Sequence, residues 1–248
     1  MMINSVRFDL SDKLIHFFRN IELGSPNSPV LPEHMGWGNI IDDVSVSALF
    51  MLRCAIKQGR LWATWSYRNY ARTIYGPRPA VCFTEMPIAA FLEAGKIREE
   101  RGEAMSPYAI VFPKIKLFEL GANPVIYGLD DRSYKMPSGN SGGPRMIDPA
   151  VFSRDEQYRF VTFNISSECP IDWSHEREWR WPLRWSCSKN FDVVVNEATD
   201  SESMPGLDFY SHGICEMGVV VKSRAEAAYI VHGVAPAKPD TPQLLTSG

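Results

Sequence analysis

The segment YAIVFPKIKLFELGANPVIYG, residues 108–128, decides the fold class because its pattern changes twice within a short length. Its first five residues are apolar or aromatic, which is typical of a buried strand. Pro113 suits the first turn of a helix, and Gly121 marks where we expect that short helix to end. Residues 124–128 then resemble another strand. A strand, a helix and a strand in such close succession indicate a fold that mixes α and β elements.

Towards the N-terminus, the sequence predicts two more strands and two more helices. The strands are expected at residues 12–18 and 79–84, and the helices at residues 42–58 and about 87–100. Both strands are apolar runs, whereas the first helix has apolar residues at near-helical spacing. Asp42 or Asp43 is a suitable N-cap for that helix, and Gly59 is suited to end it.

Towards the C-terminus, glycine, proline and polar residues dominate from 130 to 149, which predicts a long loop. Four strands and a closing helix are expected beyond it, at residues 158–165, 177–183, 191–195, 214–221 and 224–233. We therefore expect an α+β fold in a single domain at residues 1–234. The stretch 235–248 is rich in proline and polar residues, which predicts a flexible C-terminal tail.

The composition is that of a soluble globular protein. The chain has 248 residues, of which 45% are hydrophobic and 22% are charged, so it can bury a core without disulfide or metal support. Its apolar runs are shorter than the ~18 residues of a membrane helix, and its start has no signal-like apolar region, so we expect a cytoplasmic protein. The five cysteines are odd in number and contain no CxxC pair, which predicts reduced, mostly buried thiols and no metal site.

Two segments of opposite charge stand out. Residues 53–78 hold six basic side chains and no acid, and residues 190–221 hold six acids and no lysine or arginine. Five Trp and Tyr residues lie among the bases of the first segment. This mixture suits phosphate contact with base stacking, with Arg68 and Arg72 as the expected nucleic-acid contacts. The alternative is a basic helix face followed by an aromatic core cluster.

The segment DWSHEREWRWP, residues 172–182, carries two closely spaced carboxylates. In an extended strand, Glu176 and Glu178 lie on one side, because side chains alternate with period two. Such a pair is solvated, neutralised by a cation, or held to act on a developing positive charge. The alternative is an amphipathic edge strand with a charged outer face. The chain has no GxxxxGK[ST], GxGxxG or HExxH motif, so the commonest phosphate-loop, Rossmann and zincin interpretations lack support.

Two further positions are candidates for ligand contact. His16 lies within the apolar run LIHFF, where it is either a core side chain or a hydrogen-bonding group that lines a pocket. Thr84 and Glu85 end the apolar run PAVCF. Strand ends are common ligand positions because backbone donors are available there, and the alternative is a helix cap.

These pieces occur together in an order that resembles a known group of proteins. They are LIHFFR, VCFTEMPI, the 108–128 segment and W-x-x-E-x-E-W-R, which together cover residues 12–182. The chain resembles bacterial abortive-infection proteins of the AbiGi type and the related family that shares the E-x-E-W-R strand. It is similar, more distantly, to ADP-ribosyltransferases such as the DarT-like toxins.

The resemblance implies a pair of small sheets with flanking helices, which bind NAD in a cleft between them. It implies that Glu178 is the catalytic carboxylate and Glu176 its companion, and that His16 holds an NAD ribose. Thr84 takes the middle-strand position, although this chain has Phe-Thr-Glu in place of Ser-Thr-Ser. Tyr75 and Tyr108 compete for the tyrosine position of the family. The implied NAD-binding residues are His16, Phe17, Tyr75, Phe83, Thr84 and Tyr108.

The function expected from the resemblance is that of an NAD-dependent ADP-ribosyltransferase, acting as a toxin or a phage-defence effector without a metal. The basic segment favours a nucleic-acid acceptor, RNA or DNA, over a protein side chain. An inhibitory partner such as an antitoxin is a further expectation. The alternatives are a non-catalytic antitoxin-like or sensor protein of the same architecture, and an NAD glycohydrolase that uses water as the acceptor.

Overall fold

The computed structural model describes residues 9–22, 25–26, 45–69, 71–103, 105–129, 145–166, 170–184, 205–232 and 243–246. These ranges contain both helices and strands, which confirms the α+β class. The strand expected at 191–195 and most of the loop expected at 130–149 lie outside the described residues.

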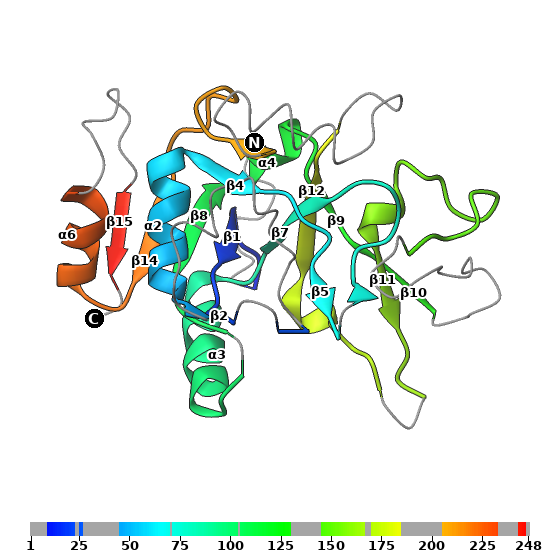
Figure 1. The fold of residues 1–248 in the computed structure, drawn as a ribbon, viewed down its shortest axis with the longest axis horizontal. Helices are drawn as coiled ribbons and strands as arrows, with labels where there is room; N and C mark the ends of the chain where they lie inside the picture. Colours follow the sequence, from blue (N-terminus) through cyan, green and yellow to red (C-terminus); the bar gives the residue numbers. More distant parts are fainter. Residues whose placement is uncertain are drawn as a thin grey trace.

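The largest sheet has seven strands in the order β15-β14-β8-β1-β7-β12-β9 (Figure 1). Its strands are β1 (Lys13–Phe17), β7 (Ala80–Thr84), β8 (Ala109–Pro113), β9 (Asn123–Pro124), β12 (Glu178–Pro182), β14 (Gly218–Val221) and β15 (Gln243–Thr246). All its neighbours pair antiparallel except β14 and β15, which are parallel. Three of these strands, β1, β7 and β8, are the apolar runs in which the sequence predicted strands.

The junction between β1 and β7 is the narrowest pairing among the central strands of this sheet. β1 pairs with β8 over five residues and β7 pairs with β12 over five residues, but β1 and β7 share only the Ile15–Thr84 pair. The sheet therefore divides into a four-strand part, β15-β14-β8-β1, and a three-strand part, β7-β12-β9. The resemblance implied two separate small sheets. In this structure the two parts are joined through the Ile15–Thr84 pair.

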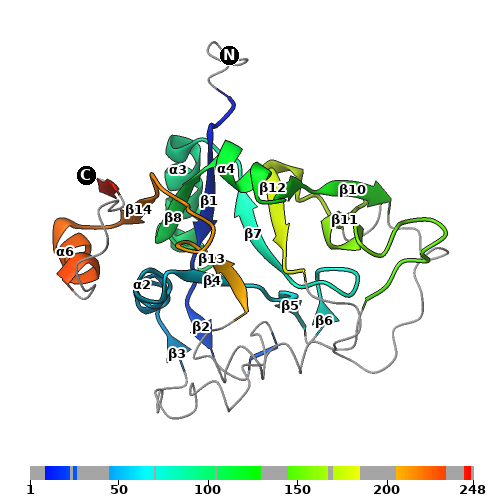
Figure 2. The ribbon, with the colours of Figure 1, turned by 90° about the horizontal axis from the view of Figure 1, so that it is seen from above.

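Side chains on the central strands alternate between two hydrophobic cores, as the pleat of a strand requires. Leu14 of β1 packs in the larger core, which includes residues of α2 (Ala48–Gln58) and α6 (Arg224–His232). The next residue, Ile15, packs in a second core with Phe91 of α3 (Ile88–Glu100). Figure 2 shows α3 and α2 on opposite sides of the sheet. Both faces of its centre are thus covered.

The helices follow local capping signals. Gly59 ends α2 with a left-handed φ of 65°, as the sequence predicted. The predicted start of α2 near residue 42 is wrong. Ser45 and Val46 form strand β3, and Ser47 caps the helix by accepting a hydrogen bond from the backbone N–H of Phe50 at 3.2 Å.

Two other predicted helices begin at a proline, which can occupy a helix start because it lacks an N–H. Pro87 precedes α3, and Pro113 precedes α4 (Lys114–Glu119). The strand predicted at 124–128 is divided into β9 and β10 (Ile126–Leu129), so its start is assigned to one sheet and its end to another.

Four two-stranded pairs accompany the main sheet. They are β2 (Ile21–Glu22) with β3 (Ser45–Val46), β4 (Arg60–Trp62) with β13 (Gly206–Asp208), β5 (Tyr67–Arg68) with β6 (Ala71–Arg72), and β10 with β11 (Phe160–Phe163). The first three lie on the α2 side of the main sheet (Figure 2). Two 3₁₀ turns complete the described elements: η3 (Gln157–Arg159) and η4 (Ser174–Glu176).

Strand β15 lies within the stretch that was expected to be a flexible tail. It pairs parallel with β14 from Gly218–Gln243 to Val221–Thr246. The pairing supplies hydrogen-bond partners to an edge of β14 that would otherwise present unpaired backbone groups.

The described residues also bear on the membrane and cysteine expectations. None of their helices combines the length and the hydropathy needed to cross a membrane. The described thiols, Cys54, Cys82 and Cys215, are all free. Cys215 is exposed and the other two are partly exposed, so the expectation of mostly buried thiols is wrong for these three.

Candidate active site

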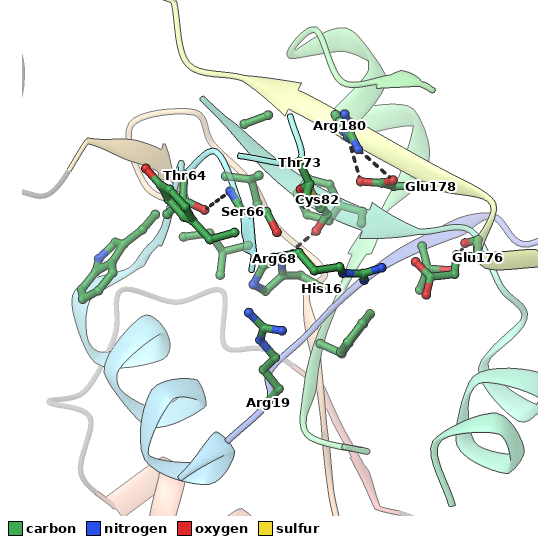
Figure 3. A pocket seen from close by; sticks show the side chains of 18 of the residues that line it. His16, Arg19, Thr64, Ser66, Arg68, Thr73, Cys82, Glu176, Glu178 and Arg180 are labelled. Atoms are coloured by element: carbon green, nitrogen blue, oxygen red, sulfur yellow. Dashed lines mark hydrogen bonds and ion pairs between the residues drawn. The ribbon is translucent and has the colours of Figure 1, made fainter. Parts of the chain in front are cut away.

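A cavity of about 780 Å³ lies beside the β1–β7 junction, within the range of about 300–1,000 Å³ that is typical of small-molecule sites. Residues of β1, β7, β12 and the β5–β6 hairpin line it, together with the α2–β4 region (Figure 3). It brings together most of the residues that the sequence singled out: His16, Phe17, Arg68, Tyr75, Phe83, Thr84, Glu176 and Glu178.

The side chain of His16 on β1 forms a hydrogen bond across the β1–β7 junction. Its Nδ1 lies 2.8 Å from the backbone oxygen of Cys82 on β7. Because a carbonyl oxygen only accepts hydrogen bonds, Nδ1 must carry a proton. Burial lowers the pKa of His16 to about 4, although the bond to Cys82 acts in the opposite direction. The imidazole is therefore neutral near pH 7, with Nε2 as a hydrogen-bond acceptor.

Glu178 is held in place by a buried arginine. The Nε of Arg180 donates to Oε1 of Glu178 at 2.7 Å, and Nη2 donates to Oε2 at 3.1 Å. Arg180 is 4% exposed, and its Nη1 donates to the backbone oxygen of Tyr158 at 2.6 Å. Burial is the largest single influence and acts to lower the pKa of Arg180, but the interactions with Glu178 and Cys82 together outweigh it, so the pKa lies above its ordinary value. These bonds fix the position of the carboxylate, and each of its oxygens can accept further bonds.

Glu176 comes to the cavity from a turn, which differs from the predicted strand. It ends η4, and Arg177 follows with a φ of 44° before β12 begins at Glu178. The two carboxylates are therefore not alternate residues of one strand face, although both line the cavity. Arg98 of α3 contacts Glu176, with Nη1 3.3 Å from Oε1.

Thr84 holds this turn in place. Its hydroxyl donates a short hydrogen bond to the backbone oxygen of Glu176 and accepts one from the backbone N–H of Met86 at 3.1 Å. The residue is 3% exposed. Both bonds stay within the protein, so the hydroxyl of Thr84 positions Glu176. Its neighbour Glu85 bonds Lys114 and Trp179, each at 2.7 Å, and ties β12 to the start of α4.

Tyr75 lies at the cavity and Tyr108 does not, which separates the two candidate tyrosines. The hydroxyl of Tyr75 accepts a hydrogen bond from Nη2 of Arg145 at 2.6 Å and lies 3.3 Å from Oγ1 of Thr162. Tyr108 donates to Oε1 of Glu226 on α6 at 2.7 Å, away from the cavity lining. The expectation that Tyr108 binds the cofactor is therefore not supported by its position.

Three other predicted residues are only partly placed as expected. Phe17 touches the cavity, but its ring packs towards Phe91 of α3, with centroids 6.0 Å apart. Phe83 touches it from the core, where it is 3% exposed. Arg72 is outside the lining and its guanidinium stacks 4.0 Å from the ring centre of Trp65.

Arg68 and Arg72 lie on opposite faces of their hairpin. In the β5–β6 pair, Arg68 is opposite Ala71 and Tyr67 is opposite Arg72. Cross-strand partners share a face, so the two arginines point in opposite directions. Only Arg68 lines the cavity, with its guanidinium 4.4 Å from the ring centre of Trp173.

Sequence reasoning missed the roles of several arginines of the cavity. Arg19, Arg98, Arg145 and Arg180 all line it. Arg180 belongs to the E-x-E-W-R motif, but its role as the partner of Glu178 needed the structure. Arg98 belongs to helix α3, and Arg145 lies outside the helices and strands. Neither residue is part of a motif that the sequence analysis identified, so no local signal marks them.

No group of three or more His, Cys, Asp or Glu side chains within the described ranges is placed to hold a metal ion. Comparison of the chain with models of protein families, with curated proteins and with solved structures found no match. The support for a function therefore comes from the residues of the cavity and from the sequence resemblance.

Proposed function

We propose that this protein is an NAD-dependent ADP-ribosyltransferase whose active site is the cavity beside the β1–β7 junction. The observation that carries the proposal is the meeting, in one cavity, of a neutral His16 and the carboxylates of Glu176 and Glu178. These residues come from segments far apart in the sequence, and they are the ones that the resemblance assigns to NAD binding and catalysis. The split of the main sheet at this point also fits the cleft between two small sheets that the resemblance implies.

The reaction needs stabilisation of a positive charge. The bond between the ribose and nicotinamide breaks, nicotinamide leaves with the electron pair, and the ribose gains oxocarbenium character. A fixed carboxylate stabilises this charge, an electrostatic effect worth about 10²- to 10³-fold or more. Glu178 suits this role because Arg180 fixes the orientation of its carboxylate before substrate binds.

The remaining residues bind and orient. Nε2 of His16 accepts a hydrogen bond from a ribose hydroxyl, because Nδ1 is committed to Cys82. Glu176 accepts the proton of the acceptor nucleophile as that nucleophile bonds to the ribose carbon. Thr84 supports this step by positioning the backbone of Glu176.

The proposed acceptor is a nucleic acid. The support is the basic and aromatic character of residues 53–78, together with the exposed position of Arg68 at the cavity. The proposed role as a toxin or phage-defence effector, and the proposed inhibitory partner, rest on the sequence resemblance alone.

The test is NAD cleavage by the purified protein, with mass spectrometry of RNA, DNA and protein for an added ADP-ribose. Glu178→Gln is expected to lower turnover about 10²- to 10³-fold while NAD still binds. Its melting temperature is expected to fall as well, because Arg180 loses the charge of its partner. Glu119→Gln, on an exposed residue outside the cavity, is the matched control.

A second variant keeps the test decisive if Glu178→Gln folds poorly. Glu176→Gln is expected to reduce transfer to the acceptor more than it reduces NAD cleavage, since Glu176 acts on the nucleophile. Wild-type turnover by a folded Glu178→Gln protein would contradict the catalytic role of Glu178.

One observation favours the alternative of a non-catalytic binding protein. Both oxygens of Glu178 are bonded to Arg180, as in a structural ion pair. If the protein only binds NAD, calorimetry is expected to detect NAD binding by the wild type, whereas mass spectrometry detects neither released nicotinamide nor an ADP-ribose adduct.

A further inference from the structure

A buried glutamine outside the cavity lining holds the chain that carries Arg145. Gln157 of η3 is 0% exposed, and its side-chain amide makes three hydrogen bonds to backbone groups. Its Oε1 accepts from the N–H of Ile147 at 3.0 Å, and its Nε2 donates to the oxygens of Ile147 and Phe152 at 2.7 and 3.0 Å. Both backbone polar groups of Ile147 are therefore bonded to one side chain.

These bonds take the place of regular secondary structure. Residues 145–152, all of which the structure describes, belong to none of its helices and strands. Ile147 is 1% exposed, and buried backbone groups without partners are costly, so the amide of Gln157 stabilises this path of the chain. Gly76 allows the close approach of Gln157, because a Cβ at residue 76 would lie 2.7 Å from the Cβ of Gln157. The position of Ile147 thus depends on Gln157.

Arg145 lies two residues before Ile147 and organises one wall of the cavity. Its Nη2 donates to the hydroxyl of Tyr75 at 2.6 Å, and its Nη1 donates to the backbone oxygen of Arg72 at 3.1 Å. Its backbone oxygen accepts from the N–H of Gly76 at 2.7 Å. Arg145 therefore joins Tyr75 to the β5–β6 hairpin, and Arg145, Tyr75 and residues of that hairpin all line the cavity.

We infer that Gln157 is a positioning residue of the cavity, which acts on ligand binding through Arg145. A wall that is ordered before the ligand arrives lowers the free-energy cost of binding, so loss of the amide is expected to weaken binding. The inference rests on the proposed function only in that NAD is the ligand used to test it. The placement of Arg145 itself can be measured without a ligand.

The first experiment measures this placement with phenylglyoxal, which modifies accessible guanidinium groups, followed by mass spectrometry of the peptides. Gln157→Met has a side chain of similar length but loses all three hydrogen bonds. Arg145 is expected to be modified about 5-fold faster in this variant, as loss of even one hydrogen bond would allow. Arg60, which Asp208 holds in another part of the lining, is the internal reference and is expected to react at an unchanged rate. Asn164→Ala, which loses bonds to Ser166 outside the lining, is the matched control.

The second experiment measures NAD affinity by calorimetry in the Glu178→Gln background, where turnover is low. Gln157→Met is expected to weaken NAD binding about 5-fold when Arg145 is present and to have little further effect in an Arg145→Gln protein. A residue that acts only on the stability of the fold would give additive losses. The double-mutant cycle therefore separates positioning from general destabilisation.

A second variant keeps the test decisive if melting curves show that Gln157→Met is unfolded. In Gln157→Glu, a protonated carboxyl accepts from Ile147 and donates to one carbonyl oxygen, whereas the ionised form donates to none. Burial raises the pKa of a carboxyl, so the change is expected near neutral pH. The modification rate of Arg145 relative to that of Arg60 is expected to fall towards the wild-type ratio as the pH is lowered from 9 to 7.

The outcomes separate this inference from the proposed function. An unchanged rate at Arg145 in folded Gln157→Met, or equal acceleration at Arg145 and Arg60, would overturn the inference. Additive losses of NAD affinity, or a rate ratio in Gln157→Glu that does not respond to pH, would also overturn it. Faster modification of Arg145 alone, in a protein whose wild type does not bind NAD, supports the positioning role and contradicts the proposed function.

Discussion

At the scale of single residues, the ring of His16 makes a structural contact through one nitrogen and is proposed to bind a ribose hydroxyl through the other. Its Nδ1 proton is donated to Cys82 across the β1–β7 junction, and its other nitrogen remains an acceptor. The rings of Phe18 and Phe83 lie edge-on to it, with centroids 5.0 and 5.9 Å away. The sequence left a core histidine and a pocket histidine as alternatives, and the geometry fits both descriptions together.

The low pKa of His16 predicts a pH dependence of stability. Its pKa is about 4 in the folded protein and 6.5 in the unfolded chain, so between these values the unfolded state binds the extra proton. Stability is therefore retained above pH 6.5 and falls as the pH drops towards 4, by at most about 3 kcal/mol. Solvent in the cavity reduces this figure, because the ring is partly exposed.

His16→Asn supplies the comparison, because its amide can still donate a hydrogen bond but does not titrate. Thermal unfolding at pH 7.5 and pH 5 is expected to show a larger fall in melting temperature for the wild type than for this variant. Carboxylates contribute equally to both proteins. Identical falls would show that His16 gains no protons on unfolding.

At the scale of elements, the η4 turn determines where Glu176 lies. The sequence predicted a strand at 177–183 and placed both carboxylates on one side only if the backbone is extended from Glu176; it is not, because Arg177 adopts a φ of 44°. Such a backbone is uncommon for arginine, so nothing in the local sequence signals it. The turn is stabilised by Thr84, which lies 92 residues earlier in the chain. A contact of that kind can be found only in the folded structure.

Removing the hydroxyl of Thr84 is expected to destabilise this turn. Thr84→Val keeps the shape but leaves the backbone oxygen of Glu176 and the N–H of Met86 without their partner. The expected loss is about 1–3 kcal/mol in the free energy of unfolding, measured by urea titration. Thr84→Ser keeps the hydroxyl and is expected to lose less. A loss in Thr84→Ser with none in Thr84→Val would mean that packing of the methyl group, and not hydrogen bonding, is what matters.

Other elements were predictable because their signals are local. The apolar runs of β1, β7 and β8 indicate buried strands, and Gly59 marks the end of α2. The start of α2 was misplaced because Asp42 and Asp43 suit an N-cap as well as Ser47 does, and pairing of β3 with β2 decides between them. Arg98 and Arg145 reach the cavity through tertiary packing, so the sequence gave no reason to select them.

At the scale of the whole molecule, the two charged segments partly meet each other. β4 comes from the basic segment and pairs with β13 from the acidic one. Arg60 and Asp208 form an ion pair across it, with side chains 19% and 21% exposed. Their charges therefore belong in part to the fold, and not only to contacts with partners.

The C-terminal strand is expected to stabilise the sheet. A chain that ends at His232 lacks β15 and leaves the edge of β14, whose residues are buried, without a neighbour. We expect a lower melting temperature and concentration-dependent association, because open strand edges pair with one another. Thermal unfolding and size-exclusion chromatography over a range of concentrations measure both effects. Unchanged behaviour would show that β15 contributes nothing to the stability of the sheet.

The order of the strands also determines when the cavity first exists during synthesis. Thr84 and the turn that it holds are 92 residues apart, which a ribosome takes roughly 5 to 20 s to translate. Throughout that interval the edge of β7 that pairs with β12 over five residues has no partner strand. A product of interrupted translation that ends before η4 therefore carries His16 and Thr84 but neither of the two carboxylates.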